Sequence, residues 1–101
     1  MKQVINSMIY DTDKSEFIAN WDDSEKHPEY KSRIESLYMS PKGVYLMEIT
    51  EGYFPEAEDL PAVIEDVRLE IVSKENAIYW LEIKGLQFEL LTHFEDELEE
   101  G

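Results

Sequence analysis

Apolar residues change their spacing close to residue 73, and this change limits the folds open to the chain. Val67, Leu69 and Ile71 alternate with polar residues, as expected for a strand with one buried face. Beyond Ser73 the apolar residues recur every three or four positions, as on one side of a helix. Strands that precede helices, rather than alternating with them, are typical of α+β proteins. The chain therefore predicts a small, mostly antiparallel sheet of three to five strands, with two C-terminal helices packed on one face.

The part of the chain before Ser73 predicts strands joined by polar turns. Ser40-Pro41-Lys42-Gly43 suits a type I turn, because proline presets the backbone angle and glycine ends the turn freely. Asp11-Thr12-Asp13 predicts a break, with Thr12 or Asp13 capping a short helical turn. Loops are expected over residues 22–32 and 51–61. Strands are expected over residues 3–10, 17–21, 34–39, 44–49 and 66–72.

Two helices are predicted in the C-terminal third, over residues 74–84 and 87–98. Ser73 suits the N-cap of the first helix, and Gly85 suits the position that ends it. The second helix carries one apolar stripe, formed by Leu90, Leu91, Phe94 and Leu98. The length of the chain fits a single domain over residues 1–101.

The charge of the chain limits its partners. Asp and Glu number 24 against 9 Lys and Arg, which gives a formal net charge of -15. Such a surface repels nucleic acid and anionic membranes, so neither is an expected direct partner. A basic protein that handles nucleic acid is the expected partner, because an acidic surface can imitate the charges of DNA. The alternative is that the acidity only maintains solubility.

Acidic residues gather in two stretches that lack Lys and Arg, one from Gly43 to Val67 and one after Lys84. Acids at the end of a helix oppose its dipole, a conflict often tolerated where function requires it. The alternative for the second stretch is a solvated tail. Tyr53 and Phe54 are candidate exposed anchors, with burial in the core as the alternative. The candidate partner-binding acids are Glu56, Glu58, Asp59, Glu65, Asp66, Glu95, Asp96, Glu97, Glu99 and Glu100.

The chain offers few residues for catalysis or for a cofactor. It has no cysteine, and its two histidines, His27 and His93, lie far apart in the sequence. It has no glycine-rich phosphate loop and no G-x-S-x-G motif. We therefore expect no enzyme, no catalytic residue, no cofactor and no metal, and a small hydrolase is disfavoured. The absence of a signal peptide and of a long apolar run, together with the lack of cysteine, favours a cytoplasmic location.

Three segments, in their order along the chain, resemble a group of small proteins of bacterial phages and mobile elements. The segments are residues 10–16 (YDTDKSE), 37–46 (LYMSPKGVYL) and 73–81 (SKENAIYWL). The family pattern has an acidic residue where this chain has Asn76. The resemblance covers most of the chain and implies a phage-borne accessory protein, in a group that includes anti-CRISPR proteins. It carries over no catalytic residue.

Charge and resemblance together predict an anti-defence inhibitor in the cytoplasm of the bacterial host. It is expected to bind a CRISPR effector stoichiometrically and to block its nucleic-acid-binding site with an acidic surface. The alternative is an immunity or antitoxin protein that neutralises a basic nuclease toxin. The effector, the contact face and the oligomeric state are left open by the sequence.

Overall fold

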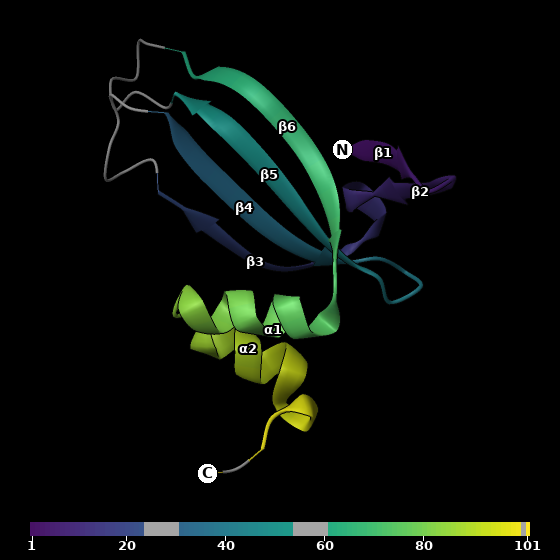
Figure 1. The fold of residues 1–101 in the computed structure, drawn as a ribbon, viewed down its shortest axis with the longest axis vertical. Coiled ribbons are helices and arrows are strands. Elements are labelled where there is room, and N and C mark those ends of the chain that lie inside the picture. The colour runs from purple at the N-terminus through teal and green to yellow at the C-terminus, as the bar shows by residue number, and fades with distance from the viewer. Residues whose placement is uncertain (24–30, 54–60, 100) are drawn as a thin grey trace.

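Four antiparallel strands form the main sheet, in the order β3-β4-β5-β6, and a two-stranded hairpin, β1-β2, lies beside it (Figure 1). The computed structural model describes residues 1–23, 31–53, 61–99 and 101. Two helices follow the last strand, so the predicted α+β fold is confirmed. The elements are β1 Lys2–Ile5, β2 Met8–Asp11, β3 Glu16–Asp22, β4 Ser32–Met39, β5 Tyr45–Tyr53, β6 Val63–Val72, α1 Lys74–Ile83 and α2 Gln87–Phe94, with short 3-10 turns η1 Thr12–Lys14 and η2 Glu95–Glu97.

The single strand predicted over residues 3–10 is wrong, because the chain reverses direction within it. Asn6 and Ser7 both have positive φ, at 51° and 66°, and they join β1 to β2. Two consecutive residues with positive φ form a type I′ turn, whose twist matches that of a two-stranded hairpin. Asparagine tolerates this conformation better than most residues, so Asn6 was the sequence feature that could have indicated the turn.

The turn between β4 and β5 is the one that the sequence predicts. The Gly43 amide donates to the Ser40 carbonyl at 2.9 Å, and the Ser40 amide donates to the Val44 carbonyl at 2.8 Å. Gly43 has a φ of 84°, which favours glycine because a side chain is strained there. The Ser40 hydroxyl also accepts a hydrogen bond from the Val44 amide at 3.0 Å. These contacts fix the register of the β4-β5 hairpin.

Other predicted boundaries shift by a few residues. β5 continues through Tyr53, so the loop predicted over 51–61 begins later than expected, and β6 begins at Val63 rather than at residue 66. Residues 54–60 of that loop, and 24–30 of the loop predicted over 22–32, lie outside the described residues. The cap of η1 is Asp11 rather than Thr12 or Asp13, since its carboxylate accepts a hydrogen bond from the Asp13 amide.

Helix α1 begins and ends where the sequence predicts. The Ser73 hydroxyl accepts a hydrogen bond from the Asn76 amide at 3.1 Å, as an N-cap does. At the other end, Gly85 has a φ of 70°, and the Leu86 amide donates to the Leu81 carbonyl at 2.9 Å. This pair of features closes the helix as a Schellman motif.

Helix α2 is shorter than the predicted range 87–98, because it ends at Phe94. Glu95–Glu97 form the 3-10 turn η2 instead, and the chain is extended at Leu98. Consecutive carboxylates at a helix C-terminus repel one another and oppose the helix dipole, which disfavours further α-helix. The acidic stretch therefore ends the helix rather than extending it.

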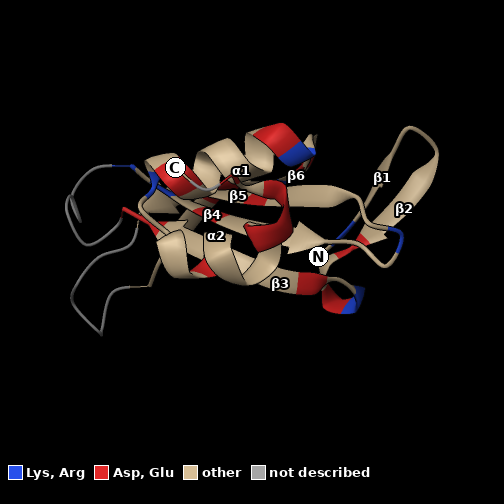
Figure 2. Ribbon diagram, turned by 90° about the horizontal axis from the view of Figure 1, so that it is seen from below, with Lys and Arg blue, Asp and Glu red and all other residues tan. Residues whose placement is uncertain are grey.

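The core lies between the helices and one face of the main sheet (Figure 2). Leu37, Met47 and Ile49 of the sheet pack against Leu81 of α1 and Phe94 of α2. At the margin, Lys84 Nζ lies 3.6 Å from the ring centroid of Trp21 and 3.7 Å from a carboxylate oxygen of Glu35. The remaining buried members of the core are Ile18, Ala19, Ala77, Trp80 and Leu90.

The apolar stripe predicted on the second helix splits between core and solvent. Leu90 and Phe94 are buried, but Leu91 and Leu98 are 54% and 36% exposed. The early end of α2 turns Leu98 away from the helical repeat, and Leu91 lies next to Leu90 on the outer side. The stripe therefore contributes two residues to the core and leaves two exposed to solvent.

The hairpin β1-β2 is attached to the outer edge of β6 through a side chain. Gln3 Nε2 donates to the Leu69 carbonyl at 3.1 Å, and Gln3 Oε1 accepts from the Leu69 amide at 3.1 Å. The amino group of Met1 donates to Thr12 Oγ1 at 2.9 Å, and the Thr12 amide donates to the Met1 carbonyl at 2.9 Å. These bonds position β2 beside the β4-β5 turn.

We predict that Gly52→Ala destabilises the fold. Gly52 lies at a bulge between β5 and β6, and a Cβ there would overlap the Val63 carbonyl oxygen and lie 2.9 Å from the Ile64 Cα. Because backbone must move to make room, the free energy of unfolding should fall by about 1–3 kcal/mol. Urea denaturation measures this change. Gly101→Ala, which has nothing within 4 Å of the new Cβ, is the control; equal stability of the two variants would contradict the prediction.

Candidate partner-binding surface

The candidate acids fall into two groups that the fold separates. Glu65 and Asp66 lie near the start of β6, whereas Glu95, Asp96 and Glu97 form η2, followed by Glu99. The start of β6 and the C-terminal segment lie at opposite ends of the longest axis (Figure 1). The described acids therefore do not form one continuous acidic face. The other candidates, Glu56, Glu58, Asp59 and Glu100, lie outside the described residues.

The acids near the start of β6 form ion pairs with basic neighbours. Lys31 Nζ lies 2.8 Å from Glu65 Oε2, and this hydrogen-bonded pair raises the pKa of Lys31. Arg68 binds three carboxylates, with distances of 2.6 Å to Glu51, 2.5 Å to Asp66 and 3.1 Å to Glu70. The hydrogen bond from Arg68 lowers the pKa of Glu51, and the three acceptors raise the pKa of Arg68. Several carboxylates at this end are thus already paired with basic side chains of the protein itself.

Most of the described C-terminal acids have no basic partner among the described residues, so their charge can act on a binding partner. Glu97 is paired, since its carboxylate lies 3.1 Å from Lys74 Nζ, and this pair raises the pKa of Lys74. Glu95, Asp96 and Glu99 are exposed, and their side chains form no ion pair with any residue in the described part of the chain. An uncompensated group of carboxylates attracts a basic partner over a longer range than paired carboxylates do.

Exposed apolar side chains lie on the two helices that precede these acids in the chain, and at Leu98. Phe88 is 77% exposed, the largest fraction among the exposed large apolar residues of the described chain. Single exposed apolar residues are common, but several together on neighbouring elements mark an interaction surface. We call this set the helical surface: Tyr79 and Ile83 of α1, Phe88 and Leu91 of α2, and Leu98.

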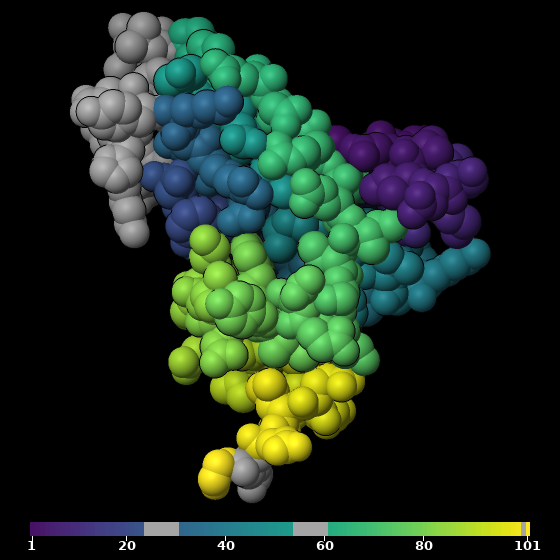
Figure 3. All heavy atoms as spheres, viewed as in Figure 1, coloured from purple at the N-terminus to yellow at the C-terminus, as the bar shows by residue number. Residues whose placement is uncertain are grey.

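A groove of about 300 Å³ includes two residues of the helical surface, Leu91 and Leu98, in its lining. Leu90, Leu91 and Leu98 supply its apolar lining, while Glu82 and Glu99 place carboxylates beside it; Gln87 completes the lining. Figure 3 shows α1, α2 and the C-terminal segment as one continuous surface below the sheet. Apolar side chains within an acidic margin suit a partner segment that carries both apolar and basic side chains.

The sequence prediction missed this surface because it expected the apolar stripe of the second helix to be buried. The adjacent pair Leu90-Leu91 was the available indication, since adjacent residues of a helix cannot both face the core fully. Of the two anchors that the sequence suggested, Tyr53 is 38% exposed at the end of β5, and Phe54 lies outside the described residues.

The described residues offer little for metal or acid–base chemistry. Within residues 1–23, 31–53, 61–99 and 101, no three His, Asp or Glu side chains are grouped so that they could hold a metal ion. His93 Nδ1 lies 3.8 Å from a Glu16 carboxylate oxygen, a single contact at the surface. The described helices include none with the length and apolar character needed to cross a membrane.

Comparison with protein-family models, with curated proteins and with solved structures found no match to this chain. The kind of partner that the helical surface suits is therefore inferred from the residues that form it. The resemblance to proteins of phages and mobile elements stays a prediction.

We predict that Arg68→Gln destabilises the protein more at pH 7 than at pH 3. Arg68 depresses the pKa of Glu51 in the folded state, so this pairing stabilises the fold above the unfolded pKa of about 4.3. The stabilisation is lost as the pH falls through the lower, folded-state pKa. Melting temperatures of the variant and the parent should therefore converge on acidification.

Lys42→Gln is the control for Arg68→Gln, because it removes the same charge where the described residues provide no ion pair. Its melting temperature should follow that of the parent at both pH values. A loss of stability in Arg68→Gln that is the same at pH 7 and pH 3 would contradict the prediction.

Proposed function

We propose that this protein is a phage-encoded anti-defence inhibitor that binds a CRISPR effector stoichiometrically and blocks its nucleic-acid-binding site. The observation that carries the proposal is the helical surface, where the exposed side chains of Leu91 and Leu98 lie beside Glu99, a C-terminal carboxylate without an ion pair among the described residues. The predicted family resemblance supplies the phage context, and the cytoplasm of the bacterial host is the place where such an inhibitor acts.

In this proposal, the two kinds of residue on the helical surface have separate tasks. The carboxylates of Glu95, Asp96 and Glu99 accelerate the encounter with a Lys- and Arg-lined channel, because opposite charges steer association. Phe88 and Leu91 then supply the apolar contact that slows dissociation. The bound inhibitor occupies a channel that would otherwise hold nucleic acid, and so excludes it.

In the proposed complex, the C-terminal end of the molecule is the part that imitates the charges of DNA. Glu65 and Asp66 already have basic partners at 2.8 Å and 2.5 Å, so binding an effector there would first break these pairs. Of the C-terminal acids, Glu95, Asp96 and Glu99 require no such exchange with the described residues, and only Glu97 would leave a basic partner, Lys74. The main acidic contact is therefore assigned to Glu95, Asp96, Glu97 and Glu99, with Glu65 and Asp66 in a secondary role.

The first experiment is a pull-down of the tagged protein from extract of a CRISPR-bearing host. Recovery of an effector, followed by its release with excess guide RNA or target DNA, would support competition for the nucleic-acid site. Recovery of a basic nuclease toxin instead would favour an immunity protein. Recovery of an effector that still binds nucleic acid at full affinity would overturn the proposed mechanism.

We predict that neutralising the C-terminal acids slows association with the effector. In Glu95→Gln/Asp96→Asn/Glu99→Gln the association rate constant should fall about ten-fold at low salt, and the difference should shrink as salt screens the charges. Surface plasmon resonance over a salt series measures both effects. The variant with the same change in charge, Glu56→Gln/Glu58→Gln/Asp59→Asn, is the comparison; equal association rates of the two variants would rule out a specific C-terminal contact.

We predict that Phe88→Ala weakens binding through faster dissociation. Phe88 is the most exposed apolar side chain of the helical surface, so its removal should leave the fold intact. Loss of an apolar anchor typically costs about 2 kcal/mol, which corresponds to roughly a thirty-fold higher dissociation constant. Val4→Ala, an exposed apolar residue of β1, is the matched control and should bind like the parent. An unchanged dissociation rate for Phe88→Ala would remove the helical surface from the interface.

A further inference from the structure

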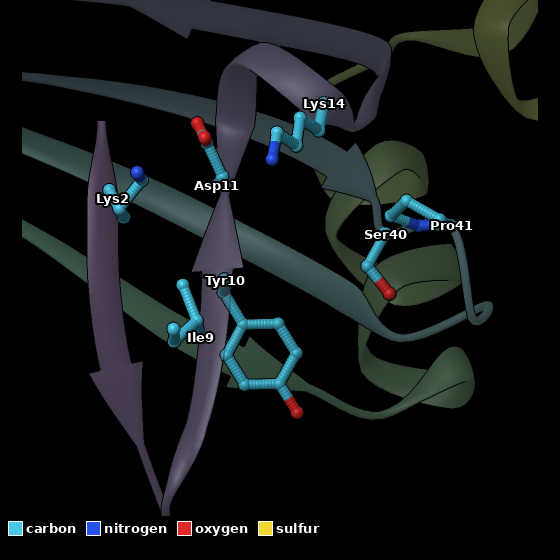
Figure 4. Close-up of a pocket in the computed structure, with 7 residues that line it drawn as sticks. All are labelled: Lys2, Ile9, Tyr10, Asp11, Lys14, Ser40 and Pro41. Atoms are coloured by element: carbon cyan, nitrogen blue, oxygen red, sulfur yellow. The ribbon is translucent and has the colours of Figure 1, made fainter.

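A second candidate site lies at the hairpin end of the molecule, between β1-β2 and the β4-β5 turn. Two adjoining cavities of about 290 and 230 Å³ share four lining residues there, namely Ile9, Tyr10, Ser40 and Pro41. Figure 4 shows Tyr10 of β2 and Ser40 of the turn among the residues that border the larger cavity. Because Tyr10 and Ser40 belong to different hairpins, the cleft depends on the docking of β1-β2.

The lysines that line this cleft have no ionic partner among the residues that the structure describes. Lys2 and Lys14 line the larger cavity, and Lys42 lines the smaller one. None of the three forms an ion pair with a residue of the described ranges, whereas every other Lys and Arg there does. In a chain with a formal net charge of -15, all the unpaired basic side chains of the described structure thus border one cleft.

The remaining lining combines apolar surface with hydrogen-bonding groups. Ile9, Pro41 and the ring of Tyr10 provide apolar surface, and Ser40, whose hydroxyl accepts a hydrogen bond from the Val44 amide, lines both cavities. One carboxylate, that of Asp11, also lines the larger cavity and accepts a hydrogen bond from the Asp13 amide at 3.0 Å. Lys2 and Lys14 lie on either side of it in Figure 4.

We propose that this cleft binds a nucleoside phosphate. The ammonium groups of Lys2, Lys14 and Lys42 attract the phosphate, as lysines do in other phosphate sites, and the apolar side chains hold the flat base. The C-terminal segment lies beyond the helices, away from the β1-β2 hairpin (Figure 1), so the lysines of the cleft are the nearer charges for a small anion and salt screens the more distant acids. A long polyanion would extend over the acidic surface beyond the cleft and be repelled, which favours a mononucleotide.

This site is separate from the helical surface, and it does not depend on the proposed inhibitor function. The test titrates the full-length protein with ADP and follows amide chemical shifts of isotope-labelled protein by NMR. Adenosine and inorganic phosphate, tested separately, show whether both halves of the ligand contribute. ADP should bind at least ten-fold more tightly than either one and should shift the amides of Tyr10 and Ser40.

Substitutions of lysines inside and outside the cleft then separate their role from a general effect of charge. In Lys2→Gln/Lys14→Gln/Lys42→Gln the affinity for ADP should fall about ten-fold, whereas Lys74→Gln, on α1, should leave it unchanged. Asp11→Asn keeps the cap of η1, because asparagine also serves as an N-cap, and removes the carboxylate that repels phosphate. It should raise the affinity about three-fold.

The proposal is overturned if ADP shifts no amide of the cleft at millimolar concentration, or if the triple variant binds ADP like the parent. It is overturned equally if Lys74→Gln weakens binding as much as the triple variant, since general attraction would then explain the result. Tighter binding of a single-stranded oligonucleotide than of ADP would reject a mononucleotide ligand. A circular dichroism spectrum of the triple variant that matches the parent shows that lost binding is not lost folding.

Discussion

The packing of α1 and α2 on one face of the four-stranded sheet is the interaction on which the rest of the structure depends. Leu37, Ile49, Leu81 and Phe94 are each no more than 1% exposed, and they join the two layers. Removing apolar surface from water is the main driving force for this contact. It also determines which side chains of the helices remain outside, and so creates the helical surface as the reverse side of the core.

The strand and helix order was predictable because local signals and the apolar pattern agree. Ser73 and Gly85 limit α1 through hydrogen bonds to neighbouring residues, and the Ser40–Gly43 turn needs only its own backbone. The β1-β2 hairpin was missed because apolar residues run on both sides of the short Asn6-Ser7 turn. The exposure of Leu91 depends on how α2 is rotated against the sheet, and such tertiary packing is not contained in the spacing alone.

The candidate surface was harder to predict, because the effective charge of an acid depends on partners that are distant in sequence. Glu51 and Arg68 are seventeen positions apart, and Lys74 and Glu97 are twenty-three apart, yet each pair is in contact. The sequence therefore locates the acids but not their neutralisation. The sequence also does not show which lysines lack an acidic partner, because in a chain with a net charge of -15 the pairing of each lysine depends on the fold.

The side chain of Gln3 occupies the place on β6 where another strand would bind. Its amide offers one donor and one acceptor to Leu69, as a backbone peptide group would. A strand edge with open hydrogen-bonding groups invites pairing with further chains, which leads to fibres or aggregates. The glutamine side chain forms the hydrogen bonds that Leu69 offers at this edge. Unlike a backbone peptide group, it is not followed by further peptide groups that could continue a strand. This single amide therefore takes up the two hydrogen-bonding groups of Leu69 that an added strand would need, and it blocks growth of the sheet at that position.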